Sequence, residues 1–199
     1  LLSNLYLHPV DQAVAEAGYE MVRYADDFVI LCRSREEAEQ ALELTRQLIE
    51  ELGLVLHPEK TRLVDATLED CGFDFLGYHF ERGRKWPRQK SLQKLKIVVR
   101  QKTRRSNGKS LKAIVVDLNR TLKGWFGYFQ HSYKTTFPYL DGWIRRRLRS
   151  LLRKRCKLRG ISKKGQDHQR WPHKFFRDAG LFSLVDARRL ACQSRRGTH

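Results

Sequence analysis

Two adjacent carboxylates, Asp26 and Asp27, are the side chains in this sequence whose types and spacing most clearly suggest chemistry. They lie between two short segments rich in aromatic and β-branched residues, 19–23 and 28–32. A polar pair between two such segments predicts a tight β-hairpin that carries both carboxylates at its tip. Aspartate is also an ordinary turn residue, so a purely structural explanation stands beside the chemical one.

Chemistry follows if both carboxylates are ionised. Neighbouring carboxylates beside apolar residues repel each other, and a bound cation relieves that repulsion. Mg²⁺ suits such a site because it prefers oxygen ligands, needs few protein carboxylates and completes its shell with water and substrate phosphates. Asp26 and Asp27 therefore predict a magnesium site that takes a phosphate-bearing substrate.

The charge of the chain divides sharply along its length. Residues 1–80 hold 6 Lys and Arg against 16 Asp and Glu, a net charge of −10. Residues 81–199 hold 34 against 6, a net charge of +28. This asymmetry predicts two functional regions, of which the second has the electrostatic character of a polyanion-binding protein.

Cysteine use and hydropathy narrow the class of protein. The four cysteines include no C-x-x-C pair, which argues against a zinc site and a disulfide framework and favours reduced thiols in a cytoplasmic protein. No apolar run approaches the ~20 residues of a membrane helix, so no membrane partner is expected.

Two helices and several strands should position the acidic pair. Apolar residues at helical spacing predict a helix over residues 2–17, with an interruption at Pro9. A second helix is predicted to start at the capping box that begins with Ser34 and to end at Gly53. Short strands are expected on either side of the turn at 57–61, and residues 72–80 predict a bent hairpin or bulged strand.

The basic region reads as a helical bundle. Helical periodicity predicts helices over residues 91–105 and 111–129, and a third that begins near Thr136 with Pro138 in its first turn. Three amphipathic helices with short links make a small bundle. Their crowded like charges disfavour folding unless phosphates neutralise them.

Two motifs carry a resemblance to a known family. Tyr24-Ala25-Asp26-Asp27 resembles the active-site hairpin of reverse transcriptases, in the form common among group II intron and related bacterial enzymes. Residues 111–152, with the strings GWFGYFQ and LDGWIRRRLRSLLRK, closely resemble the maturase-specific region, domain X, which is the thumb of group II intron reverse transcriptases. The two motifs occur in the family's order.

The resemblance implies an α+β fold, with a partial polymerase palm of antiparallel strands and packed helices followed by an α-helical thumb bundle. The implied domains are the C-terminal part of the palm at 1–80, the thumb at 81–157 and a basic C-terminal extension at 158–199. The implied activity is RNA-directed DNA polymerisation together with binding of intron RNA as a maturase.

The resemblance also assigns roles to individual residues. Asp26 and Asp27 would be catalytic metal ligands in a two-Mg²⁺ site that a further aspartate from an upstream strand completes, and Lys60 would lie near the leaving pyrophosphate. The implied substrate- and primer-binding residues are Tyr24, Ala25, Leu76 and Gly77. Basic side chains of the thumb would bind RNA: Lys94, Arg100, Arg104, Arg105, Arg145, Arg146, Arg149 and Arg153.

The implied partners are intron RNA, an RNA template with a DNA primer, dNTPs and the fingers and palm half of the same protein, and a homodimer stays open. The sequence begins at Leu1 without an initiator Met, so we expect part of a longer enzyme whose metal site is incomplete here and which alone does not extend a primer. Two other functions compete: a splicing cofactor that binds RNA without polymerase activity, and a related bacterial retro-element or defence reverse transcriptase.

Overall fold

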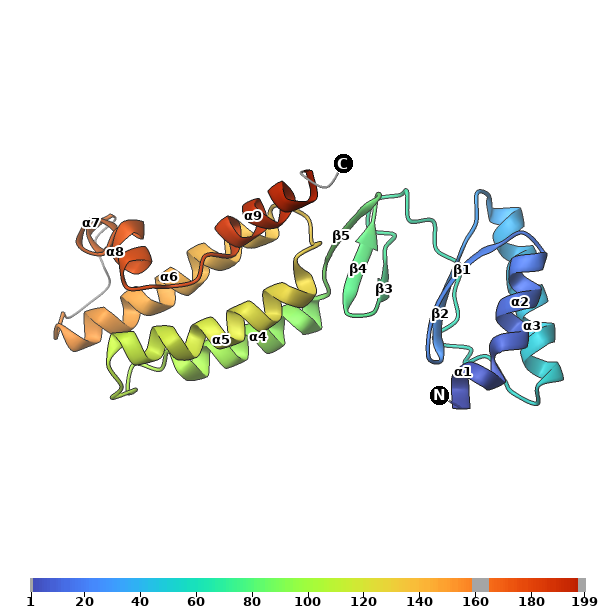
Figure 1. Cartoon of the computed structure of the whole chain (residues 1–199), viewed down its shortest axis with the longest axis horizontal. Helices are drawn as coiled ribbons and strands as arrows, with labels where there is room; N and C mark the ends of the chain where they lie inside the picture. Colours follow the sequence, from blue (N-terminus) through green and yellow to red (C-terminus); the bar gives the residue numbers. More distant parts are fainter. Residues whose placement is uncertain (1, 159–164, 197–199) are drawn as a thin grey trace. The chain divides into compact units, whose positions relative to one another are not determined.

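The computed structural model describes residues 2–158 and 165–196, with the main chain alone at 195 and 196. About 57% of the chain is helical and two small antiparallel sheets are present, which confirms the expected α+β class. The chain forms two compact units, Leu1–Gly83 and Arg84–His199 (Figure 1). Among the described residues, no helix combines the length and apolar character needed to cross a membrane. All four cysteines are free thiols.

The helices of the first unit follow the sequence pattern closely. The predicted interruption at Pro9 is confirmed, because α1 (Leu2–Tyr6) ends and α2 (His8–Glu16) begins with Pro9 in its first turn. Proline is tolerated there since the first turn needs no N–H donor. Before α3 (Arg35–Glu51), the Ser34 hydroxyl accepts a hydrogen bond from the Glu37 N–H at 3.1 Å.

The predicted hairpin is present between these helices. Strands β1 (Glu20–Tyr24) and β2 (Asp27–Leu31) pair antiparallel, with Tyr24 opposite Asp27. Helices α2 and α3 lie side by side against one face of the hairpin (Figure 1). The core between them contains the side chains Leu7, Val10, Val14 and Ile49, with Met21 and Ile30 packed against it.

The strands expected around Pro58 are not formed. Residues 54–57 and 61–65 have no regular structure, and 58–60 form a turn. The backbone bonds of this segment are local: Leu54 N–H donates to Ile49, and Lys60 and Thr61 N–H donate to the His57 carbonyl. A strand requires a neighbouring ladder, which residue preferences alone do not supply.

The segment 72–80 forms the expected hairpin without a bulge. Strands β3 (Phe73–Phe75) and β4 (Tyr78–Glu81) pair with Phe73 opposite Phe80. Leu76 and Gly77 make the two-residue turn, with φ of +46° and +79°. Positive φ at both central residues is the type I′ signature, and it matches the right-handed twist of paired strands.

The second unit is a helical bundle that follows a short strand, β5 (Arg84–Pro87). Its long helices are α4 (Gln89–Lys102), α5 (Leu111–Phe129) and α6 (Thr136–Arg155). The core holds large side chains from all three, including Val99, Leu118, Leu122, Phe137, Leu140, Leu148 and Leu151. Helix α4 ends at Lys102, earlier than expected, so Arg104 and Arg105 lie beyond it.

The C-terminal segment belongs to this same core. Helices α7 (Gln166–Arg170), α8 (His173–Asp178) and α9 (Leu184–Arg196) follow α6. Trp171, Phe176 and Leu184 are buried with the side chains of the long helices, so the described part of the predicted extension is an integral part of the unit. Residues 159–164 and 197–199 of that extension lie outside the described residues.

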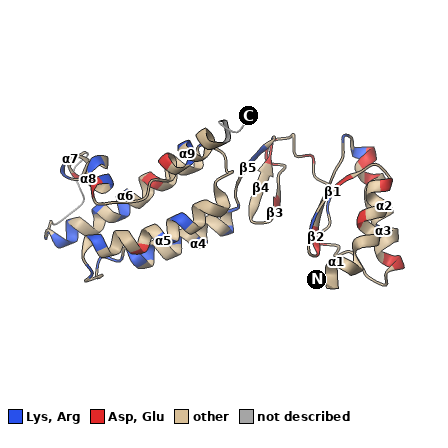
Figure 2. Ribbon diagram, viewed as in Figure 1, with Lys and Arg blue, Asp and Glu red and all other residues tan. Residues whose placement is uncertain are grey.

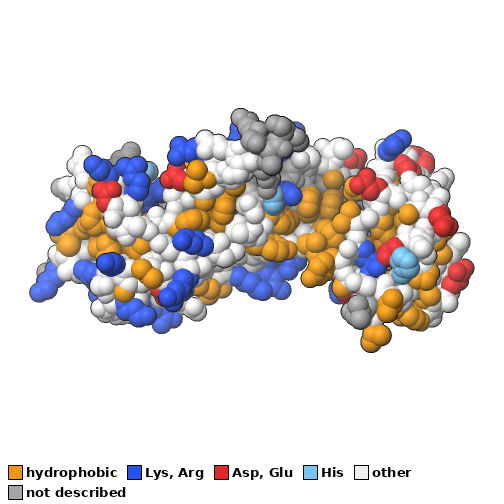
Figure 3. Space-filling model, viewed as in Figure 1, with side chains coloured by type: hydrophobic (Ala, Val, Ile, Leu, Met, Phe, Trp, Pro, Cys, Tyr) orange, Lys and Arg blue, Asp and Glu red, His pale blue; other side chains and the backbone are white. Residues whose placement is uncertain are grey.

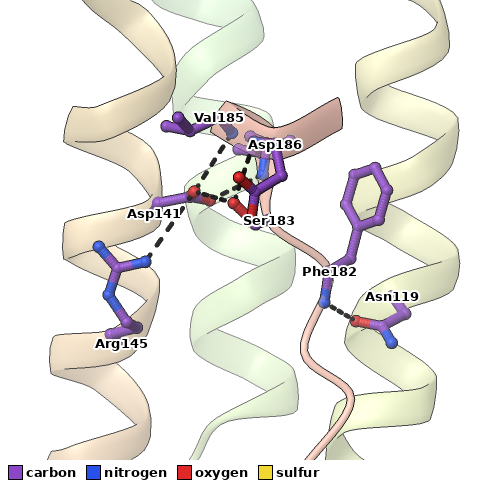
Figure 4. Close-up of polar contacts among 8 residues, drawn as sticks. Asn119, Asp141, Arg145, Phe182, Ser183, Val185 and Asp186 are labelled. Atoms are coloured by element: carbon purple, nitrogen blue, oxygen red, sulfur yellow. Dashed lines mark hydrogen bonds and ion pairs between the residues drawn. The ribbon is translucent and has the colours of Figure 1, made fainter. Parts of the chain in front are cut away.

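A buried carboxylate joins α6 to the start of α9. Asp141 accepts hydrogen bonds from the Ser183 hydroxyl at 3.0 Å and from the Leu184 and Val185 N–H groups at 3.1 and 3.3 Å (Figure 4). Burial raises the pKa of Asp141, although these donors and Arg145 oppose the rise. These hydrogen bonds satisfy the buried carboxylate. They also pair the first N–H groups of α9, which have no partner within the helix.

Candidate functional site

The acidic pair lies at the tip of the β1–β2 hairpin. Ala25 and Asp26 form a two-residue turn, and Asp27 is the first residue of β2. Ala25 has a φ of +56°, a conformation that normally favours glycine. The side chains of Tyr24, Asp26 and Asp27 are exposed, with Tyr24 at 67%. The structure thus presents both carboxylates and one aromatic ring to solvent at a single strained turn.

The carboxylates of this pair are available for a ligand. No hydrogen bond or ion pair joins either side chain to another residue in the part of the chain that the structure describes. Two unpaired, exposed carboxylates fit Mg²⁺, which binds through one or two protein carboxylates plus substrate phosphates and water. Within the described residues, no group of three or more His, Cys, Asp or Glu side chains is placed to hold a metal ion.

The other predicted polymerase residues occupy turns of the same unit. Lys60 is exposed in the turn 58–60, and its ammonium makes no ion pair with any acidic side chain among the described residues. Leu76 and Gly77 form the half-buried turn between β3 and β4. These placements suit contacts with a ligand outside the unit, and the roles of these residues stay predictions.

Charge is distributed very unevenly between the elements. In Figure 2, acidic residues predominate in the first unit, where α3 carries several of them, and basic residues are spread over the helices of the second. Residues 84–199 hold 33 Lys and Arg against 5 Asp and Glu. Four of those five acids already pair with basic side chains of the unit: Asp117, Asp141, Asp167 and Asp186. Most of the positive charge therefore has no acidic partner in the unit, and much of it is visible on the face in Figure 3.

Helices α4 and α6 join along a line of basic and aromatic side chains, here called the α4–α6 seam: Lys96, Arg100, Arg105, Tyr139, Trp143 and Arg147. Lys96 donates to the Tyr139 hydroxyl at 3.0 Å, and the Arg100 guanidinium lies 5.6 Å from the centre of the Trp143 ring. Arg147 donates to the Thr103 hydroxyl at 3.3 Å and Arg105 to the Ser150 hydroxyl at 2.9 Å.

The seam is electrostatically crowded. The pKa of Arg147 is lowered by burial first, and then by repulsion from Arg100 and Arg105. The pKa of Tyr139 is lowered by the hydrogen bond from Lys96 and by its charge. Tyr139 is 58% exposed, so an apolar ring is presented beside cations. Phosphates would relieve this repulsion, and exposed rings beside basic groups suit nucleic acid.

The structure divides the predicted RNA-binding residues into two groups. Lys94, Arg100, Arg104, Arg105 and Arg146 are exposed. In contrast, three predicted residues of α6 are largely covered: Arg145, Arg149 and Arg153.

Arg149 requires a correction. Its side chain is in the core at 4% exposure, donates to the Trp171 carbonyl at 3.0 Å and lies 5.2 Å from the centre of the Phe176 ring. A guanidinium in that position joins α6 to α8 and is not accessible to a phosphate. Arg153 pairs with Asp167 at 2.8 Å and Arg145 lies 3.9 Å from Asp141, so both charges are partly compensated. Charge composition cannot distinguish such buried arginines from surface ones.

Further basic and aromatic residues, which the sequence pattern did not indicate as RNA-binding, lie beside the predicted ones. Lys96, Tyr139, Trp143 and Arg147 complete the seam. Spacing was the signal available in the sequence. Residues 139, 143 and 147 recur every four positions and so share one helical face, and residues 96, 100 and 103 share a face of α4 with similar spacing. Only the packing of α4 beside α6 shows that the two series face each other.

Comparison with known families agrees with the geometry of both units. Residues 1–80, which contain the acidic hairpin, match the reverse transcriptase (RNA-dependent DNA polymerase) family. This match defines the class of protein. Residues 92–171 match the group II intron maturase-specific domain. No individual curated protein matches the sequence.

The chain belongs to the group II intron reverse transcriptase and maturase family. Its reverse transcriptase region is that of an RNA-directed DNA polymerase, a nucleotidyltransferase, and reverse transcriptases generally use Mg²⁺. Together, the maturase-specific and reverse transcriptase regions imply binding of intron RNA and nucleic acid substrates. The predictions of the family, the polymerase and maturase function and the enzyme class are confirmed.

Proposed function

We propose that Asp26 and Asp27 are the Mg²⁺ ligands that this chain contributes to RNA-directed DNA synthesis. The observation that carries the proposal is the pair of exposed, unpaired carboxylates at the tip of the β1–β2 hairpin, inside the region that matches reverse transcriptases. When bound, Mg²⁺ lowers the pKa of the primer hydroxyl and stabilises charge on the phosphates.

The reaction is phosphoryl transfer. The primer 3′-hydroxyl loses its proton to water and its oxygen bonds to the α-phosphorus of a dNTP. The bond from that phosphorus to the bridging oxygen breaks, and pyrophosphate leaves with the bonding pair. In this proposal Tyr24 and Ala25 support the primer terminus and its new base pair. Lys60 places an ammonium near the pyrophosphate, where it stabilises negative charge or supplies a proton. Leu76 and Gly77 contact the primer backbone.

The α4–α6 seam is proposed to bind the phosphates of intron RNA and of the template–primer. Its cations are held in place by Tyr139, Trp143, Thr103 and Ser150, so they lose little further conformational freedom when a phosphate binds. Lys94, Arg104 and Arg146 extend the basic surface around the seam.

Single-nucleotide extension by the complete enzyme tests the catalytic part. Asp26→Asn and Asp27→Asn keep the shape of each side chain but remove its charge. We expect each to lower the extension rate by about 10³-fold, the equivalent of several kcal/mol of transition-state stabilisation. Binding of template–primer should change little, because phosphates do not bind to carboxylates.

Glu43→Gln is the matched control. Glu43 is an exposed carboxylate on α3 whose partners among the described residues are Arg46 and Gln47 of the same helix, so its loss should leave extension unchanged. Extension at the wild-type rate by Asp26→Asn and Asp27→Asn together would refute the proposed site. That result would favour an RNA-binding cofactor that does not synthesise DNA.

A further inference from the structure

Arg23, the residue before Tyr24, connects the hairpin tip to both N-terminal helices. Its Nε donates to Asp11 Oδ1 in α2 at 2.6 Å, and its Nη2 donates to Asp11 Oδ2. Its Nη1 donates to Asn4 Oδ1 in α1 at 3.1 Å and to the Ala25 carbonyl at 2.7 Å. One guanidinium thus joins two helices to the turn that contains Asp26.

The bond to the Ala25 carbonyl acts on a strained turn. Ala25 has a φ of +56°, and an alanine in the left-handed region costs about 1–2 kcal/mol relative to a right-handed conformation. Strain of this kind persists only where neighbouring contacts hold the backbone in place. Because the Ala25 carbonyl belongs to the peptide that leads into Asp26, fixing that carbonyl fixes the orientation of the Asp26 main chain.

Arginine is the side chain that this position requires. Its planar fork matches the carboxylate of Asp11 with two parallel N–H bonds and still has a third nitrogen for the Ala25 carbonyl. The Arg23 side chain is 11% exposed and that of Asp11 is 31% exposed, so water screens the pair only partly. The Asp11 hydrogen bond raises the pKa of Arg23, although burial opposes the rise.

The arrangement also leaves the acidic pair free. Arg23 is three residues before Asp26 and four before Asp27, yet no described contact joins it to either carboxylate. Asp11 engages two of its nitrogens, which directs its charge away from the tip. The guanidinium therefore orders the turn without competing for the carboxylates.

We propose that Arg23, held by Asp11, is a positioning residue that orders the Ala25–Asp26 peptide so that Asp26 and Asp27 are preorganised for the cation and the nucleotide. This inference rests on the proposed function of the two aspartates. Arg23 touches neither substrate nor metal in this scheme and acts through the turn. Misplacement of reacting groups by about 1 Å costs about 100-fold in rate, so an indirect role still has a large effect.

The test uses Arg23→Lys and Asp11→Asn in the complete enzyme. Lysine keeps the charge but cannot make the forked contact and the carbonyl bond together, and asparagine removes the charge that holds the fork. Arg35→Gln is the matched control, since Arg35 makes an exposed ion pair with Glu39 on α3 of the same unit.

The first measurement is amide hydrogen exchange, which does not depend on activity. We expect Arg23→Lys and Asp11→Asn to accelerate exchange at the Asp26 and Asp27 amides by about 10-fold or more, a local opening with the centre of β2 unchanged. The control should match the wild type. Unchanged exchange at the tip in both variants would show that Arg23 does not order the turn. Equal acceleration along all of β1 and β2 would show a general structural role. Either result would overturn the proposal.

The second measurement separates positioning from binding. Both variants should lower kcat by about 10- to 100-fold. Template–primer affinity should stay constant, and the Mg²⁺ concentration for half-maximal activity should rise. Mn²⁺ should restore part of the rate, because Mg²⁺ demands the more exact ligand geometry. If both variants had the wild-type kcat and the wild-type Mg²⁺ dependence, the positioning role of Arg23 would be refuted. If Asp26→Asn were fully active, the proposed function of the aspartates would be refuted instead.

Discussion

Gly72 shows how closely single atoms are packed around the second hairpin. A Cβ at this position would lie 2.4 Å from His79 Nε2 and 2.7 Å from the Phe80 carbonyl oxygen. The imidazole is held by Asp74, whose Oδ1 is 2.8 Å from His79 Nδ1, and the carbonyl is part of the main chain. Neither neighbour moves freely, so glycine is needed here because a side chain has no room. Its backbone conformation does not require glycine.

We therefore expect Gly72→Ala to lower the free energy of unfolding of the first unit by about 1–3 kcal/mol, as overpacked sites do. The measurement is urea unfolding followed by far-UV circular dichroism and by tryptophan fluorescence. All four tryptophans are in residues 84–199, so fluorescence follows the second unit alone.

Gly124→Ala is the control, because a Cβ there meets nothing within 4 Å inside α5. This change should raise the free energy of unfolding of the second unit by about 0.5–1 kcal/mol, because alanine is more stable than glycine inside a helix. The urea midpoint followed by fluorescence should rise accordingly. If Gly72→Ala unfolded at the wild-type midpoint by both probes, the close packing at Gly72 would be disproved.

Polar contacts determine how the helices of the second unit pair. Lys102 near the end of α4 binds Asp117 of α5, with 2.5 Å between Nζ and Oδ1. Asp141 of α6 receives the start of α9, and Asn119 of α5 accepts from the Phe182 N–H at 2.8 Å (Figure 4). These contacts are directional, so they favour one register of the helices where hydrophobic packing alone is permissive.

The Lys102–Asp117 pair predicts a specific pH dependence. The hydrogen bond from Lys102 lowers the pKa of Asp117, with burial opposing it. A carboxylate whose folded pKa is below its unfolded value, about 3.9, stabilises the fold above that pH and loses the contribution as the pH falls through the folded pKa. Asp117→Asn should therefore unfold slightly earlier than the wild type at pH 6, and the difference should vanish near pH 2.

Thermal unfolding of wild type and Asp117→Asn across this range is the measurement. Both side chains are partly exposed, so solvent screening keeps the expected difference small. Lys102→Gln combined with Asp117→Asn is the control, and it should lose no more than either single change. A difference that persists undiminished at pH 2 would contradict the assignment to this carboxylate.

At the scale of the whole molecule, the two units have opposite charge. Residues 1–83 carry 7 Lys and Arg against 17 Asp and Glu, whereas residues 84–199 carry 33 against 5. Each unit has its own hydrophobic core. The carboxylates proposed to bind Mg²⁺ thus lie in one compact unit and the cations proposed to bind RNA lie in the other, so each set can be altered without disturbing the core of the other unit.

This division predicts a steep salt dependence of RNA binding. The affinity of the full chain for RNA should fall linearly on a logarithmic plot against salt, as phosphate contacts release counterions. Arg100→Gln with Tyr139→Ala in the seam should weaken binding and reduce the slope by about 1, for one lost phosphate contact.

Arg46→Gln on the acidic α3 is the control, and both its affinity and its slope should match the wild type, since Arg46 pairs with Glu43 far along the sequence from the seam. The measurement is fluorescence anisotropy with a labelled RNA at several salt concentrations. A flat salt response of the wild-type chain would contradict a phosphate-binding role for the basic helices.

Local patterns in the sequence were sufficient for much of this protein. The hairpin at Tyr24–Asp27, the restart at Pro9, the cap at Ser34 and the three long helices all follow from signals within a few residues of each other. Periodicity, capping and turn chemistry are short-range, so a single sequence contains them. The motif at Tyr24–Asp27 and the strings GWFGYFQ and LDGWIRRRLRSLLRK likewise indicated the family, and the basic composition indicated a polyanion-binding region.

Tertiary structure alone decided which side chains are accessible and which ones meet. Arg149 and Arg146 are three residues apart on one helix, yet only the first is buried against Trp171 and Phe176. Asp11, Asn4 and the Ala25 carbonyl all meet the Arg23 guanidinium, and α4 faces α6, only after distant segments pack together. Burial and long-range pairing are properties of the packed chain, because they depend on which surfaces cover each other and not on the identity of neighbours in the sequence.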